Sequence, residues 1–530
     1  MFTLSFLCVS TILYTLSLPV SSLNILVHSP AMGASHMNFM ARLADTLTEA
    51  GHDVTFLVPA ASELNRDRLG VKLTKDVIIV EQDEEMKKKM TPRGSSSSPL
   101  WRLEISSANI GKMFAWFIDT MILSCENFLR NENVINELKL RKFDVAIAEP
   151  FSVCGLALFE ALKIKKTILV SSCTHIDLIL PHIGEPEEFS WVPSLSSQVG
   201  DAMSIMEKWE NYQIVQENKK SFNKLFEAEK VAYRRTFGSQ IPDWKDLMAS
   251  ASMIFTNSIP YLDYPRATIQ KTINIGGLTV DLEKIKDEKL TKEWDEVLSS
   301  RPKTMLISFG SIMLSAEMPE PWKSSILETI KSMPNVTFIW KYEFDDLTFA
   351  SDAKNIHFSK WVPQTALLAD PRLSGFLTHG GLGSANELVH LGKPAIMVPI
   401  FGDQTRNANM LGRHGSVIVL HKKDLGDLEK VKQAVHSILY EEKYMENAKR
   451  IADMLKNQPT NPKETVVKYT EFVARFGPFS EMDPYGRKLS YLQKTFLDIY
   501  LTVVVVALVL LISFLVVIKK ILSCFKIKKD

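Results

Sequence analysis

The sequence predicts an α/β protein with two doubly wound domains and one membrane-spanning helix behind them. Three observations predict this fold class. The chain has 530 residues, enough for more than one hydrophobic core. Short runs of β-branched and aromatic residues recur between stretches suited to helices, as in parallel sheets that helices cover on both faces. Near the C-terminus, the segment from Ile499 to Ile518 carries no charged residue.

The predicted strands form two sets of six, one set in each half of the chain. Two such sets imply two sheets, because a doubly wound domain is built around one parallel sheet. In the first half the runs are NILVH from Asn24, VTFLVP from Val54, VIIVE from Val77, DVAIAE from Asp144, KTILVSS from Lys166 and MIFTNS from Met253. In the second half they are TMLISFG from Thr304, VTFIWKY from Val336, IHFSKW from Ile356, SGFLTH from Ser374, AIMVP from Ala395 and SVIVL from Ser416.

The break between the domains is predicted at INIGGL, Ile273 to Leu278, because the charged segment DLEKIKDEKLTKEWDE follows it. A charged, solvated connector is typical of a domain boundary. We therefore expect a first domain over residues 23–275, a second over 276–475 and a juxtamembrane segment over 476–498. Residues 84–99 are poor in apolar side chains and are predicted to form a surface loop.

Both ends of the chain carry targeting signals. Residues 1–22 are uncharged, apolar as far as Leu18 and then rich in small residues, which predicts a secretory signal peptide cut near Ser22. An uncleaved anchor or a buried strand stays an alternative, because no lysine or arginine precedes the apolar run. The segment 499–518 is long enough to cross a hydrocarbon core of roughly 30 Å as a helix.

The lysine-rich tail 519–530 follows the predicted membrane helix at once. The positive-inside rule places this tail in the cytosol, and both domains in the lumen or outside the cell. The last five residues, KIKKD, also resemble the Lys-x-Lys-x-x signal that returns membrane proteins to the endoplasmic reticulum. We therefore expect a single-pass protein of the endoplasmic reticulum membrane with lumenal domains.

Charge and cysteine content exclude several classes of protein. The 62 lysines and arginines nearly balance the 61 acidic residues, so no basic field points to nucleic acid. On the lumenal side Cys125, Cys154 and Cys173 are odd in number and lack Cys-x-x-Cys spacing, which predicts neither a disulfide framework nor a zinc site. Asn335 begins an N-glycosylation sequon, and its position just before an expected strand leaves its occupancy open.

A histidine and a cluster of glycines stand at the end of an expected strand, in FLTHGGLGSANELVH from Phe376 to His390. Ligands of open parallel sheets bind beyond the carboxyl ends of the strands, and a helix that begins there offers N–H groups to an anion. The stretch therefore predicts a phosphate site, with a plain glycine turn capped by a serine as the alternative. The dinucleotide fingerprint is broken, because Asn386 stands where glycine or alanine belongs.

Three motifs together resemble the signature of the UDP-glycosyltransferases, in the membrane-bound animal group that includes the glucuronosyltransferases. They are WVPQ from Trp361, the stretch from His379 to Glu387, and PIFGDQ from Pro399. Matching stretches run from SHMNFMARLADTLTEAGHDVTFLVP near the start, through FGS at Phe309, to the lysine tail, so the resemblance covers nearly the whole chain. It implies a GT-B fold, in which two Rossmann-like domains face a cleft, and sugar transfer from a UDP-sugar.

The resemblance places the UDP-sugar in the second domain. Trp361 would stack on the uracil ring, and Gln364 would hydrogen-bond the nucleoside. Glu387 would accept hydrogen bonds from the ribose hydroxyls, while Asp403 and Gln404 would bind hydroxyls of the transferred sugar. The alternatives are a core tryptophan after a strand and, for Glu387, a surface charge that the helix dipole favours.

The diphosphate would lie at the glycine cluster. His379 and the backbone N–H groups of Gly381, Gly383 and Ser384 would hold it, and Ser311 of the FGS motif would lie on its other side. Members of the family often carry asparagine four residues after the histidine, where this chain has Gly383, so one side-chain donor is lost. No Asp-x-Asp metal motif occurs in the sequence, so donors and a helix dipole would stabilise the departing UDP. We expect neither a metal nor a cofactor besides the UDP-sugar.

The catalytic base would come from the first domain. His36 would take the proton of an acceptor hydroxyl, which then attacks the anomeric carbon from the face opposite UDP and inverts it. Histidine suits this role because its pKa lies near the working pH. An aspartate usually orients that histidine in the family, and this chain has Glu149 there, which still accepts from the imidazole Nδ1–H. Without the resemblance, a purely structural histidine would be the simpler interpretation.

We expect transfer of glucuronic acid or glucose to a hydroxyl of a small lipophilic acceptor, whose identity the sequence leaves open along with any homo-oligomer. A two-carboxylate glycosidase is disfavoured because no acidic pair stands out. A nicotinamide-dependent oxidoreductase is disfavoured by the broken fingerprint. A non-catalytic sugar-nucleotide or lipid-binding membrane protein of the same fold stays an alternative, because Glu149 and Gly383 depart from the family pattern.

Overall fold

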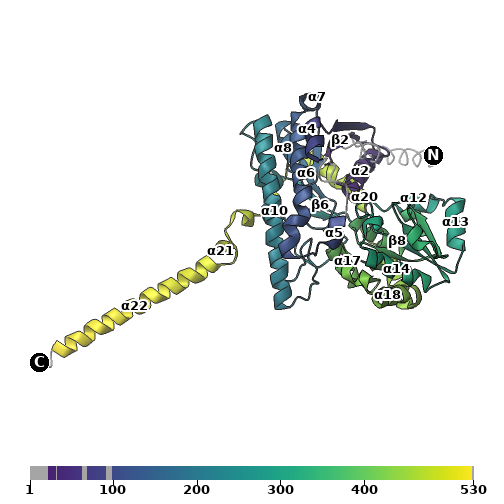
Figure 1. The fold of residues 1–530 in the computed structure, drawn as a ribbon. Coiled ribbons are helices and arrows are strands. Elements are labelled where there is room, and N and C mark those ends of the chain that lie inside the picture. Colours follow the sequence, from purple (N-terminus) through teal and green to yellow (C-terminus); the bar gives the residue numbers. More distant parts are fainter. Residues whose placement is uncertain (1–21, 31–32, 62–68, 91–97, 528–530) are drawn as a thin grey trace, which may run out of the picture.

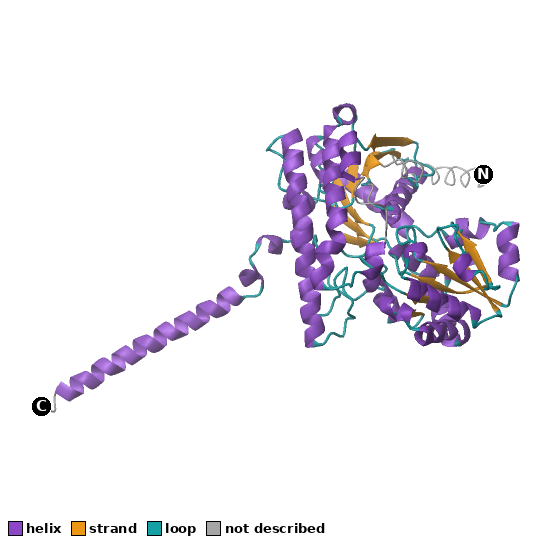
Figure 2. Ribbon diagram, viewed as in Figure 1, coloured by secondary structure: helices purple, strands orange, loops and turns teal. Residues whose placement is uncertain are grey.

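The structure, a computed structural model, describes residues 22–30, 33–61, 69–90 and 98–527. The predicted signal peptide therefore lies outside the described residues except for Ser22, and so do residues 528–530 of the predicted retrieval signal. Two α/β bodies lie side by side, and a long C-terminal helix projects away from them (Figure 1, Figure 2). We name the bodies the first lobe and the second lobe, after the order of their strands in the chain.

The first lobe is built on a seven-stranded sheet with the order β3-β2-β1-β4-β5-β6-β7, in which every neighbouring pair is parallel. Strands β4, β5 and β6 are buried at every position, which is why they stand out in the sequence as unbroken apolar runs. The strands are β1 (Asn24–His28), β2 (Asp53–Ala61), β3 (Asp76–Glu81), β4 (Val145–Ala148), β5 (Thr167–Ser171), β6 (Met253–Thr256) and β7 (Thr272–Asn274).

Helices cover both faces of this sheet. One face packs against α6 (Ile110–Arg130), α7 (Glu132–Leu140), α8 (Cys154–Ala161), α10 (Ile205–Phe237) and α11 (Trp244–Ala249). The other face packs against α2 (Ala34–Glu49) and α20 (Pro462–Phe476). The long helix α10 lies beside α6 (Figure 1). The shorter helices of this part of the chain are α4 (Glu84–Met90), α5 (Ser98–Arg102) and α9 (Leu180–Ile183).

The second lobe holds a six-stranded sheet with the order β10-β9-β8-β11-β12-β13, again parallel throughout. Its strands are β8 (Lys303–Ser308), β9 (Val336–Lys341), β10 (Ile356–Ser359), β11 (Leu373–Thr378), β12 (Ala395–Met397) and β13 (Val417–Val419). One face packs against α14 (Glu320–Lys331) and α18 (Leu428–Tyr440). The other packs against α13 (Lys292–Ser299), α15 (Gln364–Ala369), α16 (Leu382–Leu391), α17 (Gln404–Gly412) and α19 (Glu442–Lys456), while α12 (Leu282–Asp287) precedes them.

The predicted fold class is confirmed, and each of the predicted strand runs corresponds to an observed strand. Strand β7 was not predicted, because its three residues form too short a run to stand out. The surface-loop prediction for residues 84–99 is wrong for 84–90, which form α4, and for 98 and 99, which begin α5, while 91–97 lie outside the described residues. Helix α4 has a charge pattern of its own. Its first turn is acidic and its last turn carries three lysines, an arrangement that suits the helix dipole.

Helix α20 crosses from the second lobe to the first. Val466 and Val473 lie in the core beneath the first sheet, and Lys166 Nζ donates a hydrogen bond to the carbonyl of Ala474. Except for Phe476, this helix lies within the range 276–475 that the sequence assigns to the second domain. Its amphipathic pattern predicts a helix with one buried face but does not tell which sheet buries that face.

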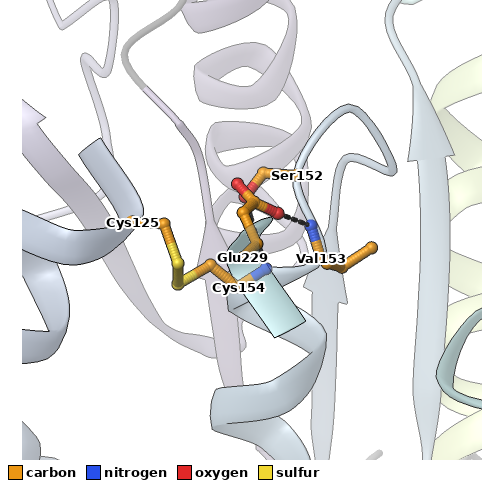
Figure 3. The surroundings of a disulfide bond; sticks show 5 residues. All are labelled: Cys125, Ser152, Val153, Cys154 and Glu229. Atoms are coloured by element: carbon orange, nitrogen blue, oxygen red, sulfur yellow. Dashed lines mark hydrogen bonds between the residues drawn. A yellow bond between two sulfur atoms is a disulfide. The ribbon is translucent and has the colours of Figure 1, made fainter. Parts of the chain in front are cut away.

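A disulfide bond joins Cys125 of α6 to Cys154, the first residue of α8, with the Cα atoms 5.8 Å apart (Figure 3). The prediction of no disulfide is therefore wrong. The two cysteines are 29 residues apart and meet because α6 and α8 pack on the same face of the first sheet. A contact that depends on tertiary packing leaves no mark in cysteine spacing. Cys173 is a free, buried cysteine.

The C-terminal helix α22 (Leu497–Ile527) is preceded by α21 (Tyr491–Lys494) and projects away from both lobes (Figure 1). Its segment Leu497–Ser523 is long and apolar enough to cross a membrane, and none of the most apolar window is buried in the protein. This segment contains the predicted span 499–518. A helix that is apolar on all sides and packs against nothing suits a lipid environment.

Candidate active site

The predicted site residues gather where each sheet reverses its winding. In the first sheet this point lies between β1 and β4, and in the second between β8 and β11. Ligands of open α/β sheets bind beyond the carboxyl ends of the strands at such switch points. His36 follows β1, Glu149 follows β4 directly, and Ser311 and His379 follow β8 and β11. The sequence therefore brings polar side chains to the switch point of both lobes.

His36 lies in the first turn of α2, and its ring contacts the predicted orienting residue. The Nδ1 atom of His36 is 3.0 Å from Glu149 Oε1 and 2.7 Å from the hydroxyl of Ser172. The contact between Nδ1 and a carboxylate oxygen favours the tautomer with the proton on Nδ1 and the lone pair on Nε2. The ring also packs edge-on against Phe151, with the centroids 5.4 Å apart. Glu149 is fully buried, whereas the side chain of His36 is partly exposed.

The charge state of His36 depends on both lobes. Burial disfavours the imidazolium, but the charge and hydrogen bond of Glu149, together with the charge of Asp403, outweigh it and raise the pKa of His36. Asp403 belongs to the second lobe, at the start of α17. Burial raises the pKa of Asp403, and the hydrogen bond from Asn407 and the charge of His36 act against that rise. These two site residues therefore influence each other across the lobes.

His379 lies against the loop that carries Ser311. A Cβ atom added to Gly310 would come within 2.7 Å of His379 Cε1, and Gly310 has a φ of +84° that only glycine adopts readily. A Cβ atom added to Gly381 would likewise lie 2.7 Å from His379 Nε2. Burial and the nearby charge of Lys341 lower the pKa of His379 to about 4, so the ring is neutral at neutral pH.

The glycine cluster opens helix α16 as predicted. Gly381 is the N-cap residue, and no side chain caps the helix, so the alternative of a serine-capped turn is wrong. Gly383 is exposed, with no heavy atom within 4 Å of where its Cβ would stand. A helix N-terminus without a side-chain cap keeps its first N–H groups available to another acceptor. The exposed residue Ser311 lies on the facing loop.

Four side chains of the second lobe form a small polar cluster, and the exposed Trp361 precedes it by three residues in the chain. Gln364 Nε2 donates to Ser384 Oγ at 3.0 Å and to Glu387 Oε2 at 2.6 Å. Thr365 donates to the other oxygen of Glu387 at 2.6 Å, and burial raises the pKa of this carboxyl group. Trp361 is 69% exposed, so the alternative of a core tryptophan is wrong.

Asp403 and Gln404 lie at the N-terminus of α17, but they face different partners. Asp403 Oδ2 accepts a hydrogen bond from Asn407 Nδ2 at 2.8 Å. Gln404 is buried, and its Oε1 accepts from the backbone N–H groups of Ile400 and Phe401 at 2.9 and 3.1 Å. The amide oxygen of Gln404 therefore holds its own loop, and only its NH₂ group is left to donate to a ligand.

The two lobes touch beside the site. A Cβ atom on Gly33, in the segment between β1 and α2, would lie 3.7 Å from Ile312 Cδ1 in the loop after β8. Trp101 of α5 reaches into the core of the second lobe, where its indole N–H donates to the carbonyl of Leu314 at 3.1 Å. The segment that leads into α2 and the loop that carries Ser311 are thus neighbours.

Sequence reasoning missed three residues that contact the site: Ser172, Thr365 and Asn407. Ser172 stands directly after β5, so its place beyond a strand was a usable signal, as it was for Glu149 and His379. Thr365 and Asn407 lie one and three residues from predicted site residues on the same helices. In the described part of the chain no group of three or more His, Cys, Asp or Glu side chains is arranged to hold a metal ion. Metal independence stays a prediction.

Comparisons with known sequences agree with this geometry. A model of the family described as UDP-glucoronosyl and UDP-glucosyl transferase matches residues 24–530. The putative UDP-glucuronosyltransferase ugt-56 of Caenorhabditis elegans is 31% identical over 476 residues, which cover 87% of this chain and 88% of the relative. UDP-glucuronosyltransferase 1A9 of Mus musculus is 24% identical over 487 residues, which cover 91% of this chain and 89% of the relative.

Solved glycosyltransferases share the fold. The UDP-glucosyltransferase from Polygonum tinctorium capable of glucosylating indoxyl, in complex with 3,4-dichloroaniline, superposes with a TM-score of 0.59 at 16% identity, over 86% of this chain and 99% of that one. The glycosyltransferase VinC in complex with dTDP gives 0.56 at 15% identity, over 86% and 100%. The fold is therefore GT-B. Because the family model spans both lobes and the C-terminal helix, the chain belongs to the UDP-glucoronosyl and UDP-glucosyl transferase family.

Proposed function

We propose that the protein transfers glucuronic acid or glucose from a UDP-sugar to a hydroxyl of a small lipophilic acceptor, with inversion and without a metal ion. One observation carries this proposal. The imidazole of His36 is oriented by Glu149 at 3.0 Å in the first lobe and responds to the charge of Asp403 in the second. A base oriented in this way, within electrostatic reach of the second lobe, suits proton removal from an acceptor next to a bound diphosphate.

The proposed reaction begins when Nε2 of His36 removes the proton of the acceptor hydroxyl. The acceptor oxygen forms a bond to the anomeric carbon while the bond from that carbon to the UDP oxygen breaks. Glu149 keeps the Nδ1 proton in place and stabilises the imidazolium that forms. The negative charge of the departing UDP is stabilised by N–H groups at the start of α16 and by the helix dipole.

Donor contacts follow from the polar cluster of the second lobe. Trp361 would stack on uracil, and the pair formed by Gln364 and Glu387 would hydrogen-bond the nucleoside and ribose. His379 is neutral at neutral pH, so it would donate to the diphosphate through one N–H without adding a charge. Asp403 and the NH₂ group of Gln404 would bind sugar hydroxyls.

The choice of sugar and acceptor rests on relatives. The named relatives are UDP-glucuronosyltransferases, which favours glucuronic acid, and a structural neighbour glucosylates indoxyl, a small aromatic hydroxyl compound. A single apolar helix at the C-terminus would hold both lobes beside a bilayer, where lipophilic acceptors concentrate. The lysine-rich tail supports an endoplasmic reticulum location with the lobes in the lumen.

The test uses microsomes that contain the full-length chain. These are incubated with several labelled UDP-sugars and a panel of phenols, and the conjugates are identified by mass. We expect one UDP-sugar to give conjugates, and His36→Ala to lower kcat by about 10²–10⁴-fold, the usual contribution of a general base. His436→Ala on the exposed surface of α18 is the matched control and should behave as the wild type. UDP binding without turnover in the wild type would favour a non-catalytic binding protein.

A further inference from the structure

Three polar residues stand in a row at the carboxyl ends of neighbouring strands in the first sheet. Glu149, Ser172 and Asn257 are each the first residue after β4, β5 and β6, which are adjacent in that order. Ser171 pairs with Thr256, so Ser172 and Asn257 leave their strands at the same level. Neighbouring strands are about 4.8 Å apart, which brings the side chains of successive strands within hydrogen-bonding reach.

Ser172 contacts both His36, the proposed base, and Glu149, which orients it. Its hydroxyl lies 2.7 Å from His36 Nδ1 and donates to Glu149 Oε1, while its backbone N–H donates to the same carboxylate oxygen at 3.0 Å. Glu149 Oε1 therefore receives hydrogen bonds from the ring, the hydroxyl and the backbone at once. The extra methylene of glutamate, compared with aspartate, is fixed by these contacts rather than left free to rotate.

Asn257 in turn holds the backbone of Ser172. Its Nδ2 donates to the carbonyl of Ser172 at 2.8 Å, and its backbone N–H donates to the carbonyls of Ser171 and Cys173 at 3.1 and 3.2 Å. A carbonyl only accepts, so the orientation of the Asn257 amide is fixed and its Oδ1 must point away from Ser172. The side chain is buried, which makes an unpaired Oδ1 costly.

The partner of that oxygen belongs to the other lobe. Asn386 Nδ2 donates to Asn257 Oδ1 at 3.1 Å, and Asn386 is buried on α16. This is the helix that opens at the glycine cluster and carries Ser384 and Glu387. The hydrogen bonds therefore run without a gap from the donor-site helix to the ring of His36, through Asn257 and Ser172.

We propose that Ser172, Asn257 and Asn386 form a positioning relay that couples the place of α16 to the orientation and basicity of His36. The inference rests on the proposed role of His36 as the base. None of the three residues is catalytic in this proposal. They hold Glu149 against Nδ1 of His36. The base strength of His36 therefore depends on the position of helix α16.

The experiment measures His36 itself in the full-length protein in detergent. Diethyl pyrocarbonate modifies neutral imidazole, so the pH dependence of labelling at the peptide that carries His36, read by mass spectrometry, reports its pKa without any turnover. The variants are Ser172→Ala, Asn257→Ala, Asn386→Ala and the double variant of the two asparagines. Ser171→Ala is the matched control, because that hydroxyl bonds only to the carbonyls of Cys173 and Thr174.

We expect the labelling curve to move to lower pH in the three single variants, because a misaligned Glu149 no longer raises the pKa of His36. The double variant should move no further than either single variant, since both break one relay. Where the wild type turns over, the acid limb of kcat/KM should move with the labelling curve. Ser172→Thr keeps the hydroxyl and should restore the wild-type curve, and the control should match the wild type in both measurements.

Unchanged labelling in Asn386→Ala and Asn257→Ala, in proteins that still bind UDP by calorimetry, would overturn the relay and leave the proposed function untouched. Additive shifts in the double variant would also overturn it, because they would mean independent structural effects. If the wild type gives no conjugate with any UDP-sugar but the labelling curves of the variants shift as expected, the proposed function is contradicted and the relay is supported.

Discussion

Trp361 is an exposed side chain of the predicted donor site, with 69% of its surface open to solvent. Stacking of the uracil base on the indole would remove this apolar area from water. We expect Trp361→Ala to weaken UDP binding by about 1–3 kcal/mol, roughly 5- to 150-fold in Kd, as for other stacked bases. Calorimetry with UDP measures this directly. Trp361→Phe, which keeps an aromatic face, should lose less, and equal affinity of the alanine variant would remove the indole from the site.

At the same scale, the residues that were predictable are those whose chemistry is rare. A histidine or a glutamate beyond a strand stands out, so His36, Glu149 and His379 could be named as candidates from the sequence and the family pattern. Ser172 and Asn257 occupy equally informative places, but serine and asparagine are common at strand ends, where they also cap turns. Only the distances from Ser172 to His36 and Glu149 distinguish a site residue from a turn residue.

The start of α8 is held by a buried carboxyl group. Glu229 of α10 accepts hydrogen bonds from Ser152 Oγ at 2.8 Å and from the N–H of Val153 at 2.6 Å, next to the disulfide (Figure 3). Burial raises the pKa of Glu229 from 4.5 to about 8. A raised carboxyl pKa means stability that is present below pH 4.5 and is lost as the pH rises through 8.

The buried carboxyl group of Glu229 leads to a prediction for how the stability of the protein depends on pH. Each unit of the raised pKa corresponds to about 1.4 kcal/mol, so we expect roughly 2–4 kcal/mol to be lost between pH 5 and pH 8. Glu229→Gln keeps one acceptor and one donor and should flatten this pH dependence. Thermal unfolding at several pH values measures it. Glu227→Gln, half-exposed on the same helix, is the control and should keep the wild-type slope.

Elements differ in how far the sequence determines them. Each predicted strand was found because its pattern is local and both faces of the sheets are covered. Helix α4 was missed because a stretch poor in apolar residues also fits a loop, and its charges only favour a helix once it is anchored. The disulfide between Cys125 and Cys154 depends on how α6 and α8 meet, which no local pattern contains.

At the scale of the whole molecule, two α/β domains and a long apolar C-terminal helix could be predicted from chain length and from the recurrence of apolar runs, but the way the lobes are joined could not. Helix α20 packs beneath the first sheet although its sequence follows the last strand of the second. Asn257 and Asn386 meet although 129 residues separate them. Such contacts arise from the relative placement of two finished cores, and single-sequence periodicity carries no information on that placement.

A buried ion pair between the lobes allows that placement to be tested. Arg406 of α17 donates through Nη2 to Asp263 Oδ1 at 2.6 Å, and Asp263 follows β6 in the first lobe. Both side chains are almost fully buried, and the guanidinium lies over the ring of Tyr264. Ser258 donates to the other carboxylate oxygen at 2.6 Å. If Arg406 were removed, the charge of Asp263 would be left without solvent and without an opposite charge in contact with it.

We therefore expect Arg406→Met to lower the free energy of unfolding by roughly 3–5 kcal/mol, because Asp263 stays buried and unpaired. Adding Asp263→Asn removes that charge, and the amide can still accept from the Tyr264 N–H and donate to Ser258, so the double variant should regain at least half of the loss. Denaturant unfolding of the detergent-solubilised chain measures both. Equal stability of the single and double variants would mean that an unpaired Asp263 costs little and that this ion pair does not stabilise the contact between the lobes.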